Sequence, residues 1–407
     1  MSSKPTNYRP TIVGGTPIFD QRVSIVRPVL PRLDELADEL ATIFETGMVT
    51  KGRHLAAFEQ AMAEHLEVEH AVAVSSCTSG LMLVYQALDL RGEVVVPSYT
   101  FMATVSSLIW AGLKPVFADV DRETTNLDPA AVELAITPET RAIVAVHNFG
   151  VPAEIDQLRD IAERHSLRLI FDAAHGLGSL YRGQPVGGQA DAHVYSLSPT
   201  KLVVAGEGGI VATNNDEVAQ RVRTNREYGM APGYDSVSAG INARMSEFHA
   251  LLGLHSLERL AVGVERRQQV AARYREQLAS LPGIFFQQVR DGDRSSYKDL
   301  AIFIEPESFG LTRDQLAAAL SAENIDTRTY YNPPVHRHTA YRSYAPDESA
   351  LPSTNWLCDR VLCLPIYSDM EDDRVDGISM AVRRIHDAAD EVAAALPAMA
   401  ASPASRA

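Results

Sequence analysis

The sequence is poor in cysteine and lacks the patterns that most often mark a metal site or a membrane span. Its 407 residues include three cysteines, Cys77, Cys358 and Cys363, an odd and sparse set that excludes a disulfide framework. No Cys-x-x-Cys pair or His-Glu-x-x-His motif offers metal ligands at the usual spacing, so we predict no metal site. No apolar run approaches the roughly 18 residues that span a bilayer. The polar N-terminal residues lack a signal-peptide core, which indicates a soluble cytoplasmic protein.

Positive charge is also in short supply. The chain has 37 Lys and Arg residues against 52 Asp and Glu residues, a formal net charge of −15. Nucleic acids and anionic membranes require a basic surface, so the composition argues against both as partners. A small anionic ligand held in a local pocket is still compatible with this composition.

Short apolar runs alternate with helical patterns over the first two thirds of the chain, which predicts an α/β fold. Near-continuous apolar strands separated by helices indicate a mostly parallel sheet that is covered on both faces. The predicted strands are 71–75, 93–97, 114–120, 142–148, 167–172, 192–197 and 208–214.

The pattern changes twice toward the C-terminus. Residues 247–283 read as one long helical stretch, with leucines at helical spacing. A smaller α+β domain follows, with strands in 296–306 and 361–367 and helices in 311–325 and 372–396. We therefore expect an N-terminal extension (1–20), a large domain (21–260), a small domain (261–397) and a flexible tail (398–407).

Three segments at predicted strand ends carry chemistry. Ser75–Gly80 places small hydroxylated residues where a helix begins, a site that binds phosphate or simply caps the helix. Asp172 ends an apolar strand, where α/β proteins bind ligands, although it could equally cap the next helix. Lys201 follows another strand and precedes a glycine-rich turn, and a surface lysine is the plainer interpretation of it alone.

Together these segments form the set that pyridoxal phosphate requires. A phosphate cup, an acid for the pyridine nitrogen and a lysine for the aldehyde follow one another on strand ends of one sheet. A dinucleotide enzyme is disfavoured because no Gly-x-Gly-x-x-Gly loop follows a strand.

The sequence resembles the pyridoxal-phosphate-dependent nucleotide-sugar aminotransferases of the DegT–StrS type, which have the aspartate-aminotransferase fold (fold type I). The resemblance covers nearly the whole chain and rests on motifs in a fixed order. They are GGTP (14–17), GMVTKG (47–52), CTSG (77–80), VVVPSYTFMAT (94–104), PVFADVD (115–121), HNFG (147–150), FDAAHGLGS (171–179), SLSPTKLVVAGEGG (196–209), GINARMSE (240–247) and NPPVH (332–336).

This resemblance implies roles for individual residues. Lys201 would carry the cofactor aldehyde as an imine and move protons, and Asp172 would pair with the pyridinium nitrogen. His175 would lie near the ring hydroxyl and Phe101 would stack on the ring, although either could be an ordinary core residue. The implied phosphate ligands are Thr78, Ser79 and Ser196, together with Asn242 from a neighbouring subunit, which makes the protein a homodimer.

The substrate residues are less well defined by the resemblance. Lys51, Arg53 and Arg244 are candidates for binding the diphosphate, with ordinary surface charges as the alternative, and His336 of the NPPVH motif is a further candidate. The chain departs from the family at four positions that line or adjoin the acceptor pocket, namely Cys77, Ser198, Ile241 and Ala243. Lys201 itself favours amino transfer over deoxygenation, because a histidine replaces this lysine in the dehydratase branch.

The implied reaction moves an amino group from an amino acid, most often L-glutamate in similar enzymes, to a nucleotide-linked keto-deoxy sugar. We expect a dTDP-4-keto-6-deoxyhexose, with amination at C4 favoured over C3. Two alternatives are a cyclitol-ketone aminotransferase of the same family and a non-catalytic sensor that binds pyridoxal phosphate. Intact Lys201 and Asp172 argue against the sensor.

Overall fold

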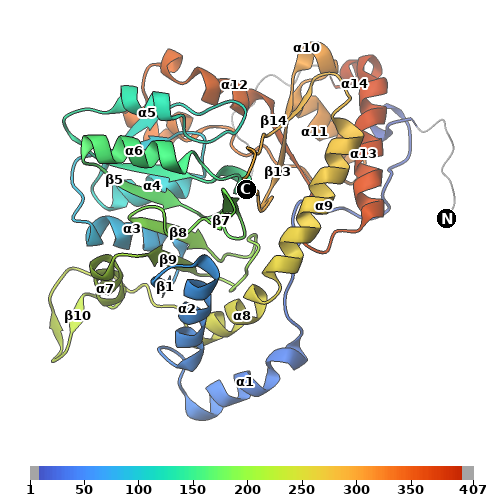
Figure 1. Ribbon diagram of the computed structural model, residues 1–407. Coiled ribbons are helices and arrows are strands. Elements are labelled where there is room, and N and C mark those ends of the chain that lie inside the picture. Colours follow the sequence, from blue (N-terminus) through green and yellow to red (C-terminus); the bar gives the residue numbers. More distant parts are fainter. Residues whose placement is uncertain (1–8, 397–407) are drawn as a thin grey trace.

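A seven-stranded sheet forms the centre of the larger part of the molecule (Figure 1). The computed structural model describes residues 9–396. Along the sheet the order is β1-β9-β8-β5-β4-β2-β3, and only β9 runs antiparallel to its neighbours. All seven predicted runs are strands of this one sheet, so the predicted fold class is confirmed. The strands are β1 (His70–Val74), β2 (Glu93–Pro97), β3 (Lys114–Ala118), β4 (Thr140–Val146), β5 (Arg168–Asp172), β8 (Ala192–Ser196) and β9 (Gly209–Thr213).

Helices cover both faces of this sheet, which explains why its strands are apolar throughout. In β2, Val94 and Val96 face one apolar cluster and Val95 faces another on the opposite side. The first face is covered by α3 (Cys77–Ala87), α4 (Met102–Trp110) and α7 (Asp216–Asn225). The second face is covered by α2 (Arg53–Leu66), α5 (Pro129–Ala135), α6 (Ile155–His165) and α8 (Glu247–Leu257).

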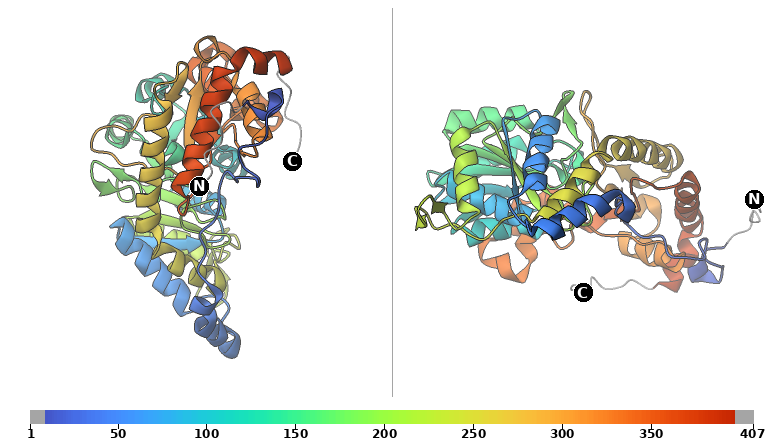
Figure 2. Two further views of the ribbon diagram at one scale, coloured as in Figure 1. Left: turned by 90° about the vertical axis from the view of Figure 1, so that its right-hand side faces the viewer. Right: turned by 90° about the horizontal axis from the view of Figure 1, so that it is seen from below.

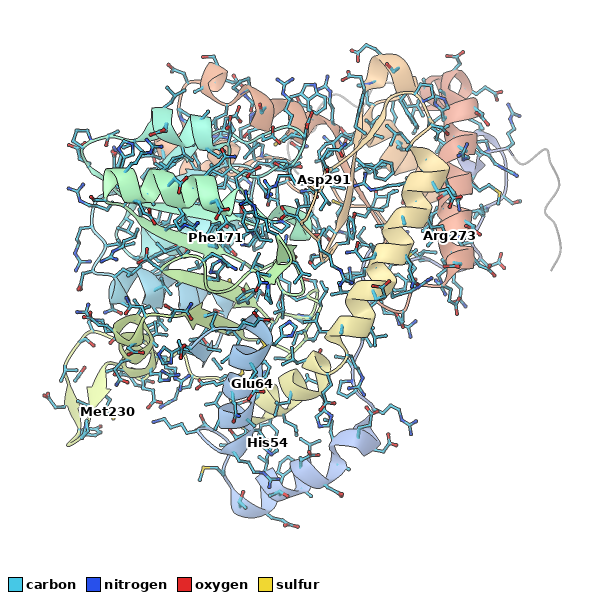
Figure 3. All side chains as sticks on the ribbon, viewed as in Figure 1. His54, Glu64, Phe171, Met230, Arg273 and Asp291 are labelled. Atoms are coloured by element: carbon cyan, nitrogen blue, oxygen red, sulfur yellow. The ribbon has the colours of Figure 1, made fainter. Side chains whose placement is uncertain are left out.

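An aromatic stack fills the middle of the second face. The ring of Phe171, labelled in Figure 3, packs against both His147 and His193 with centroids 4.7 Å apart, and the two imidazole centroids lie 5.8 Å from each other. Both histidines are fully buried. Burial lowers the pKa of His193 to about 3 and lowers that of His147 as well, because a buried imidazolium loses its hydration. Both rings are therefore neutral in the folded protein.

The smaller part of the molecule is built on a three-stranded antiparallel sheet, ordered β12-β13-β14. Strands β13 (Leu300–Ile304) and β14 (Val361–Leu364) agree with the sequence prediction. The sequence did not predict β12 (Ile284–Phe286), which has only three residues and leaves Phe285 half exposed. The helices of this part are α10 (Pro306–Phe309), α11 (Arg313–Ala322), α12 (Pro352–Arg360), α13 (Asp372–Asp387) and α14 (Ala389–Ala395).

Two predicted helices are each divided in two. The stretch 247–283 forms α8 and α9 (Leu260–Leu278), interrupted at Glu258 and Arg259. The stretch 372–396 forms α13 and α14, interrupted at Ala388. Helix α9 joins the two parts of the molecule, because its first turns pack in the large core and its later turns pack in the small one.

The N-terminal segment packs against the small core. Ile12, Val13, Ile18 and Phe19 contact that core, and Val23 forms a parallel bridge to Ile325. From there the chain runs to α1 (Leu33–Thr46), which lies at the end of the molecule far from the small sheet (Figure 2). Residues 1–8 and the expected tail, 398–407, lie outside the described residues.

Several short elements complete the description. They are the 3-10 turns η1 (Thr11–Val13), η2 (Asn148–Gly150), η3 (Val335–Arg337), η4 (Thr339–Tyr344) and η5 (Glu348–Ala350), and the two-residue strands β6 (Leu180–Tyr181), β7 (Gln184–Pro185), β10 (Met230–Ala231) and β11 (Asp235–Ser236). Over residues 9–396, no helix is both long and apolar enough to cross a membrane.

Candidate active site

The predicted cofactor residues meet at one edge of the large sheet. Strands β1, β2, β5 and β8 run in the same direction, so their carboxyl ends lie side by side. The helix start at Cys77 follows β1, Asp172 ends β5, and Lys201 lies in the turn after β8. This edge is where ligands bind in open α/β sheets.

Asp172 is held in a buried position with both carboxylate oxygens engaged. Its Oδ2 accepts a 2.7 Å hydrogen bond from Thr104 Oγ1, and its Oδ1 accepts one of 3.1 Å from Ala174 N. The Cys77 thiol lies 3.8 Å from the same Oδ1. Burial raises the pKa of Asp172, although the hydrogen bonds from Thr104 and Ala174 oppose that effect. A cation brought to this carboxyl group would favour its charged form.

Lys201 is only partly buried by area, yet its ammonium group is poorly solvated. Burial lowers the pKa of Lys201 to about 8, and the positive charge of Lys298 acts in the same direction. No hydrogen bond joins Nζ of Lys201 to another of the described residues. The amine is therefore free to react, and part of it is neutral near pH 7.

His175 follows Asp172 in the same loop and is buried. Its Nδ1 accepts a 3.3 Å hydrogen bond from the backbone N–H of Phe149, whose ring stacks on the imidazole at 6.5 Å between centroids. Burial lowers the pKa of His175 well below its usual value, and the charges of Lys201 and Lys298 add to the effect. The imidazole is therefore neutral, with its proton on Nε2.

The start of α3 forms the predicted phosphate cup. Ser76 caps the helix by accepting a hydrogen bond from Ser79 N, and the Ser79 hydroxyl donates to Ser76 O at 2.9 Å. The Ser79 side chain is thus engaged in capping, the alternative that the sequence left open. Thr78 is half-buried and makes no side-chain hydrogen bond to a described residue, and Ser196 lies 3.4 Å from Ser198.

A glycine lets β9 approach this helix start closely. A Cβ atom added to Gly209 would lie 2.7 Å from Cys77 N, closer than real Cβ contacts allow. The glycine at this position therefore keeps the first N–H groups of α3 beside the end of the sheet.

Phe101 is the N-cap residue of α4, and it is 52% exposed. His336, in contrast, is buried: its Nδ1 lies 2.7 Å from Ser98 Oγ, and its backbone N–H donates to the same oxygen. Burial lowers the pKa of His336 to about 4, so this side chain is neutral when it hydrogen-bonds Ser98, the residue that follows β2.

The remaining candidates form a separate cluster. Lys51 makes an ion pair with Glu227, Glu227 pairs with Asn242 in an isolated bridge, and the Arg244 guanidinium lies 5.7 Å from the ring centroid of Tyr228. No hydrogen bond or ion pair within residues 9–396 joins this cluster to Lys201 or Asp172. The cluster is joined to the cup through the backbone, where Ser75 N donates to Ala243 O at 2.8 Å.

The buried carboxylate of Glu247 holds this cluster in place. It accepts hydrogen bonds from the backbone N–H groups of Gly52, His54 and Leu55 at 2.9–3.0 Å, which caps the start of α2. The motifs GMVTKG and GINARMSE, distant in the sequence, are thereby joined. Arg53, also predicted at this site, lies 3.4 Å from the ring of its neighbour His54.

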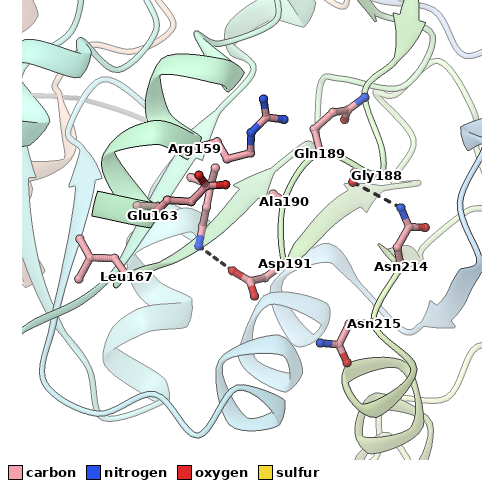
Figure 4. A pocket seen from close by; sticks show the side chains of 11 residues that line it. Arg159, Glu163, Leu167, Gly188, Gln189, Ala190, Asp191, Asn214 and Asn215 are labelled. Carbon is pink, nitrogen blue, oxygen red and sulfur yellow. Dashed lines mark hydrogen bonds between the residues drawn. The ribbon is translucent and has the colours of Figure 1, made fainter. Parts of the chain in front are cut away.

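A cavity of about 430 Å³ lies at the opposite edge of the sheet, near the start of β5 and β8 (Figure 4). Arg159, Glu163, Asp191 and Asn214 are among its lining residues, and Asp191 accepts a 2.8 Å hydrogen bond from Leu169 N. None of the predicted site residues lines it, so it is distinct from the candidate active site.

Sequence reasoning missed three residues of the site. Thr104 could have been found, because it belongs to the quoted motif 94–104 and begins a helix beside a strand end. Lys298 and Asp299 lie just before β13, and their charges act in opposite directions on the pKa of Lys201. Nothing in their local sequence indicates this effect.

Comparisons with known proteins agree with this geometry. Residues 33–383 match the DegT/DnrJ/EryC1/StrS aminotransferase family. The spore coat polysaccharide biosynthesis protein SpsC of Bacillus subtilis is 34% identical over 372 residues, which are 88% of this chain and 95% of that protein.

Two solved structures extend the comparison. The structure of DesI in the presence of its TDP-sugar product is 37% identical and superposes with a TM-score of 0.89, covering 94% of this chain and 98% of that one. The structure of S. venezuelae DesV in complex with a ketimine intermediate is 34% identical, with a TM-score of 0.84 and coverage of 90% and 99%. The resemblance drawn from the sequence motifs is confirmed. The chain belongs to the DegT/DnrJ/EryC1/StrS aminotransferase family, whose members depend on pyridoxal phosphate, and it is a sugar aminotransferase.

Proposed function

We propose that this enzyme uses pyridoxal phosphate to move an amino group from L-glutamate to C4 of a dTDP-linked 4-keto-6-deoxyhexose. Two side chains at neighbouring strand ends carry the proposal. The amine of Lys201 makes no hydrogen bond to another described residue, and the carboxyl group of Asp172 is buried. The 37% identity to DesI, whose structure contains a TDP-sugar product, supports the nucleotide-sugar acceptor.

The residues present fit the cofactor. Lys201 offers a free amine for the aldehyde, Asp172 offers a carboxylate whose charged form needs a cationic partner, and the start of α3 offers N–H groups for a phosphate. In this proposal Thr78, Ser79 and Ser196 bind the phosphate, and the exposed ring of Phe101 stacks on the cofactor. When bound, the cofactor supplies an aldehyde that captures amines and a ring that withdraws electrons from the carbon that loses its proton.

Lys201 is the residue that moves protons. With a pKa of about 8, roughly a tenth of its amine is neutral at pH 7, enough to act as a base. Its Nζ takes the proton from Cα of the amino donor and, in the second half-reaction, delivers a proton to the carbon that receives the amino group. Nζ gives up each proton that it takes, so it returns to the neutral amine and one lysine serves both half-reactions.

His175 and the aromatic residues around it orient the reacting groups. Because Nδ1 of His175 accepts from Phe149 N, its Nε2–H is the free donor, suited to an oxygen of the cofactor ring. Phe149 stacks on Tyr331 with centroids 5.8 Å apart, and Tyr99 meets both rings edge-on. These buried rings keep water away from that side of the site.

The enzyme acts as a homodimer in this proposal, with Asn242 reaching the phosphate in the site of a second copy. The support is that Glu227 joins Lys51 to Asn242, while no hydrogen bond or ion pair among the described residues joins Lys51, Asn242 or Arg244 to Lys201 of their own chain. Apolar side chains in the nearby segments 48–49 and 228–237 are exposed, and one of them, Met230, lies on the hairpin β10–β11 that projects from the body (Figure 3). These side chains are Met48, Val49, Tyr228, Met230, Tyr234 and Val237.

The reaction can be tested directly with purified full-length protein. The protein would be incubated with pyridoxal phosphate, L-glutamate and dTDP-4-keto-6-deoxyglucose, and the products identified by mass spectrometry and NMR. We expect a dTDP-4-amino-4,6-dideoxy sugar and one equivalent of 2-oxoglutarate. A 3-amino product would show that the enzyme aminates C3. If the sugar is not aminated but a cyclitol ketone offered in its place is, the acceptor is a cyclitol ketone.

A further inference from the structure

The loop after β5, which carries His175, is fastened to the segment that precedes β13. Ser296 of that segment is fully buried, and its Oγ donates a 2.9 Å hydrogen bond to the carbonyl oxygen of His175. Further along the loop, Ser179 Oγ accepts a hydrogen bond of 3.2 Å from Ser296 N. Leu180 and Arg294 then exchange two backbone hydrogen bonds of 2.8 and 2.9 Å. The loop is therefore held at His175 and again where it ends.

A glycine makes room for the hydroxyl group of Ser296. Gly150 has a φ of +97°, and a Cβ atom added to it would lie 2.3 Å from Ser296 Oγ. Its carbonyl oxygen accepts hydrogen bonds from Ser296 N at 3.2 Å and from Ser179 Oγ at 2.7 Å. A side chain at position 150 would therefore displace the Ser296 hydroxyl from the carbonyl group of His175.

The imidazole of His175 is held separately, by the residue next to that glycine. Phe149 N donates to Nδ1 of His175 at 3.3 Å, and Phe149 is itself fixed, because it is fully buried and its ring stacks on that of Tyr331. Nε2 of His175 makes no hydrogen bond to another described residue. The carbonyl group and Nδ1 of His175 are thus both fixed, and together they determine where the free Nε2–H lies.

The segment that carries Ser296 is anchored on its far side by helix α9. Arg267 is 2% exposed, and its guanidinium donates to the carbonyl oxygens of Tyr297 and Lys298 at 2.8 and 3.1 Å. The hydroxyl of Ser295 accepts a 3.0 Å hydrogen bond from Tyr297 N, within the segment itself. Ser296 is therefore a fixed point between α9 and the loop of His175.

We propose that Ser296 is a positioning residue that acts through His175. Its hydroxyl group fixes the backbone of His175, and this places Nε2–H as a donor to the hydroxyl group of the cofactor ring. The inference deepens the proposed function, because it rests on His175 as the hydrogen-bond donor to that ring.

The test compares two ligands that differ only in the ring hydroxyl group. Full-length protein freed of cofactor would be titrated by calorimetry with pyridoxamine phosphate and with 3-deoxypyridoxamine phosphate, which lacks that group. Neither compound carries an aldehyde, so neither forms a covalent bond with Lys201. The ratio of the two affinities therefore reports the contacts of the ring hydroxyl alone.

A positioning role predicts a change in this ratio. Wild type should prefer pyridoxamine phosphate by about tenfold, and Ser296→Ala should reduce the preference to about threefold, because the donor is no longer aligned. His175→Phe should abolish the preference, and adding Ser296→Ala to it should change nothing further. Ser295→Ala is the matched control: it removes an equally buried hydroxyl that makes no hydrogen bond to a described residue of the His175 loop, and it should keep the preference of wild type.

A purely structural serine would behave differently. If Ser296→Ala weakens both compounds equally, or if wild type shows no preference, the proposal is overturned while the sugar chemistry stands. If wild type binds neither compound, the proposed function is overturned with it. Should Ser296→Ala fail to fold, as judged by circular dichroism, Ser296→Cys decides by the same ratio: its thiol is a weak donor, so a reduced preference supports the proposal and an unchanged one overturns it.

Discussion

Thr104 donates a 2.7 Å hydrogen bond to Oδ2 of Asp172 from the first turn of α4. Thr104 in turn lies 2.8 Å from the hydroxyl of Thr100, so a chain of two hydroxyls ends on the carboxylate. Burial raises the pKa of Asp172, and this hydrogen bond is the strongest of the influences that oppose it. Thr104 therefore helps to keep Asp172 ionised, as a partner for a protonated pyridine ring.

Replacing Thr104 by valine tests this relationship. The side chain keeps its shape but loses the donor, so the neutral form of Asp172 becomes more favourable. A hydrogen bond to a charged group contributes roughly 1.5 kcal/mol, and we expect the cofactor to bind about tenfold more weakly. Equilibrium dialysis with pyridoxal phosphate measures the change, and Thr104→Ser, which retains a hydroxyl, is the control. Equal affinity of wild type and the valine variant would show that Thr104 does not support Asp172.

The buried histidine stack predicts a loss of stability in acid. His193 has a folded-state pKa of about 3 against about 6.5 when unfolded, so the unfolded chain binds more protons between these values. The contribution of neutral His193 to the free energy of unfolding is present in full above pH 6.5, and it is lost as the pH falls toward 3. Between pH 6.5 and 5 this loss is about 2 kcal/mol for His193, with a further loss from His147.

Urea unfolding at several pH values measures the effect. His193→Phe should flatten the dependence of the unfolding free energy on pH between 6.5 and 5. Phe171→Leu disturbs the same stack without removing a titratable group, so it should lower stability equally at each pH. If His193→Phe retains the full acid slope, the loss comes from other groups.

Much of this architecture follows from the sequence, because each large-sheet strand is an uninterrupted apolar run bounded by polar turns. The placement of Asp172 and Lys201 at one edge followed as well, since one residue ends β5 and the other follows β8, and a parallel sheet brings the ends of these strands together. A local sequence pattern does not predict features that depend on residues far away in the chain. Strand β12 is too short for a detectable period, and the break between α8 and α9 occurs within an unbroken helical pattern.

The same limit applies to the site. Nothing near Lys298 in the sequence indicates that its charge lowers the pKa of Lys201, because that effect depends on how segments far apart in the chain pack together. Glu247 carries no local sign of its role either. Its carboxylate caps α2, which lies nearly two hundred residues earlier in the chain.

The cap formed by Glu247 predicts a specific loss of stability. Glu247→Ala would leave the N–H groups of Gly52, His54 and Leu55 without their acceptor at the buried start of α2. We expect the unfolding free energy to fall by about 3 kcal/mol, measured by urea denaturation. Glu64→Ala, on the exposed side of the same helix (Figure 3), should change it by less than about 0.5 kcal/mol. Similar effects of the two substitutions would mean that the cap contributes little.

The proposed sharing of sites between two copies predicts complementation between inactive variants. Lys201→Ala lacks the reactive amine, and Asn242→Ala lacks the side chain that serves the other copy's site. In a mixed dimer, the site that uses Lys201 of the second variant receives Asn242 from the first and is intact. The other site lacks both side chains.

Mixing the two variants in equal amounts, with unfolding and refolding to exchange subunits, should therefore restore activity to about a quarter of wild type, since half of the dimers contain one intact site. Each variant refolded alone is the control. Sites built from a single chain would give no such recovery, because each chain would then carry its own defect in every site that it forms. The size of the recovered activity thus distinguishes a shared site from a self-contained one, even when both variants form stable dimers.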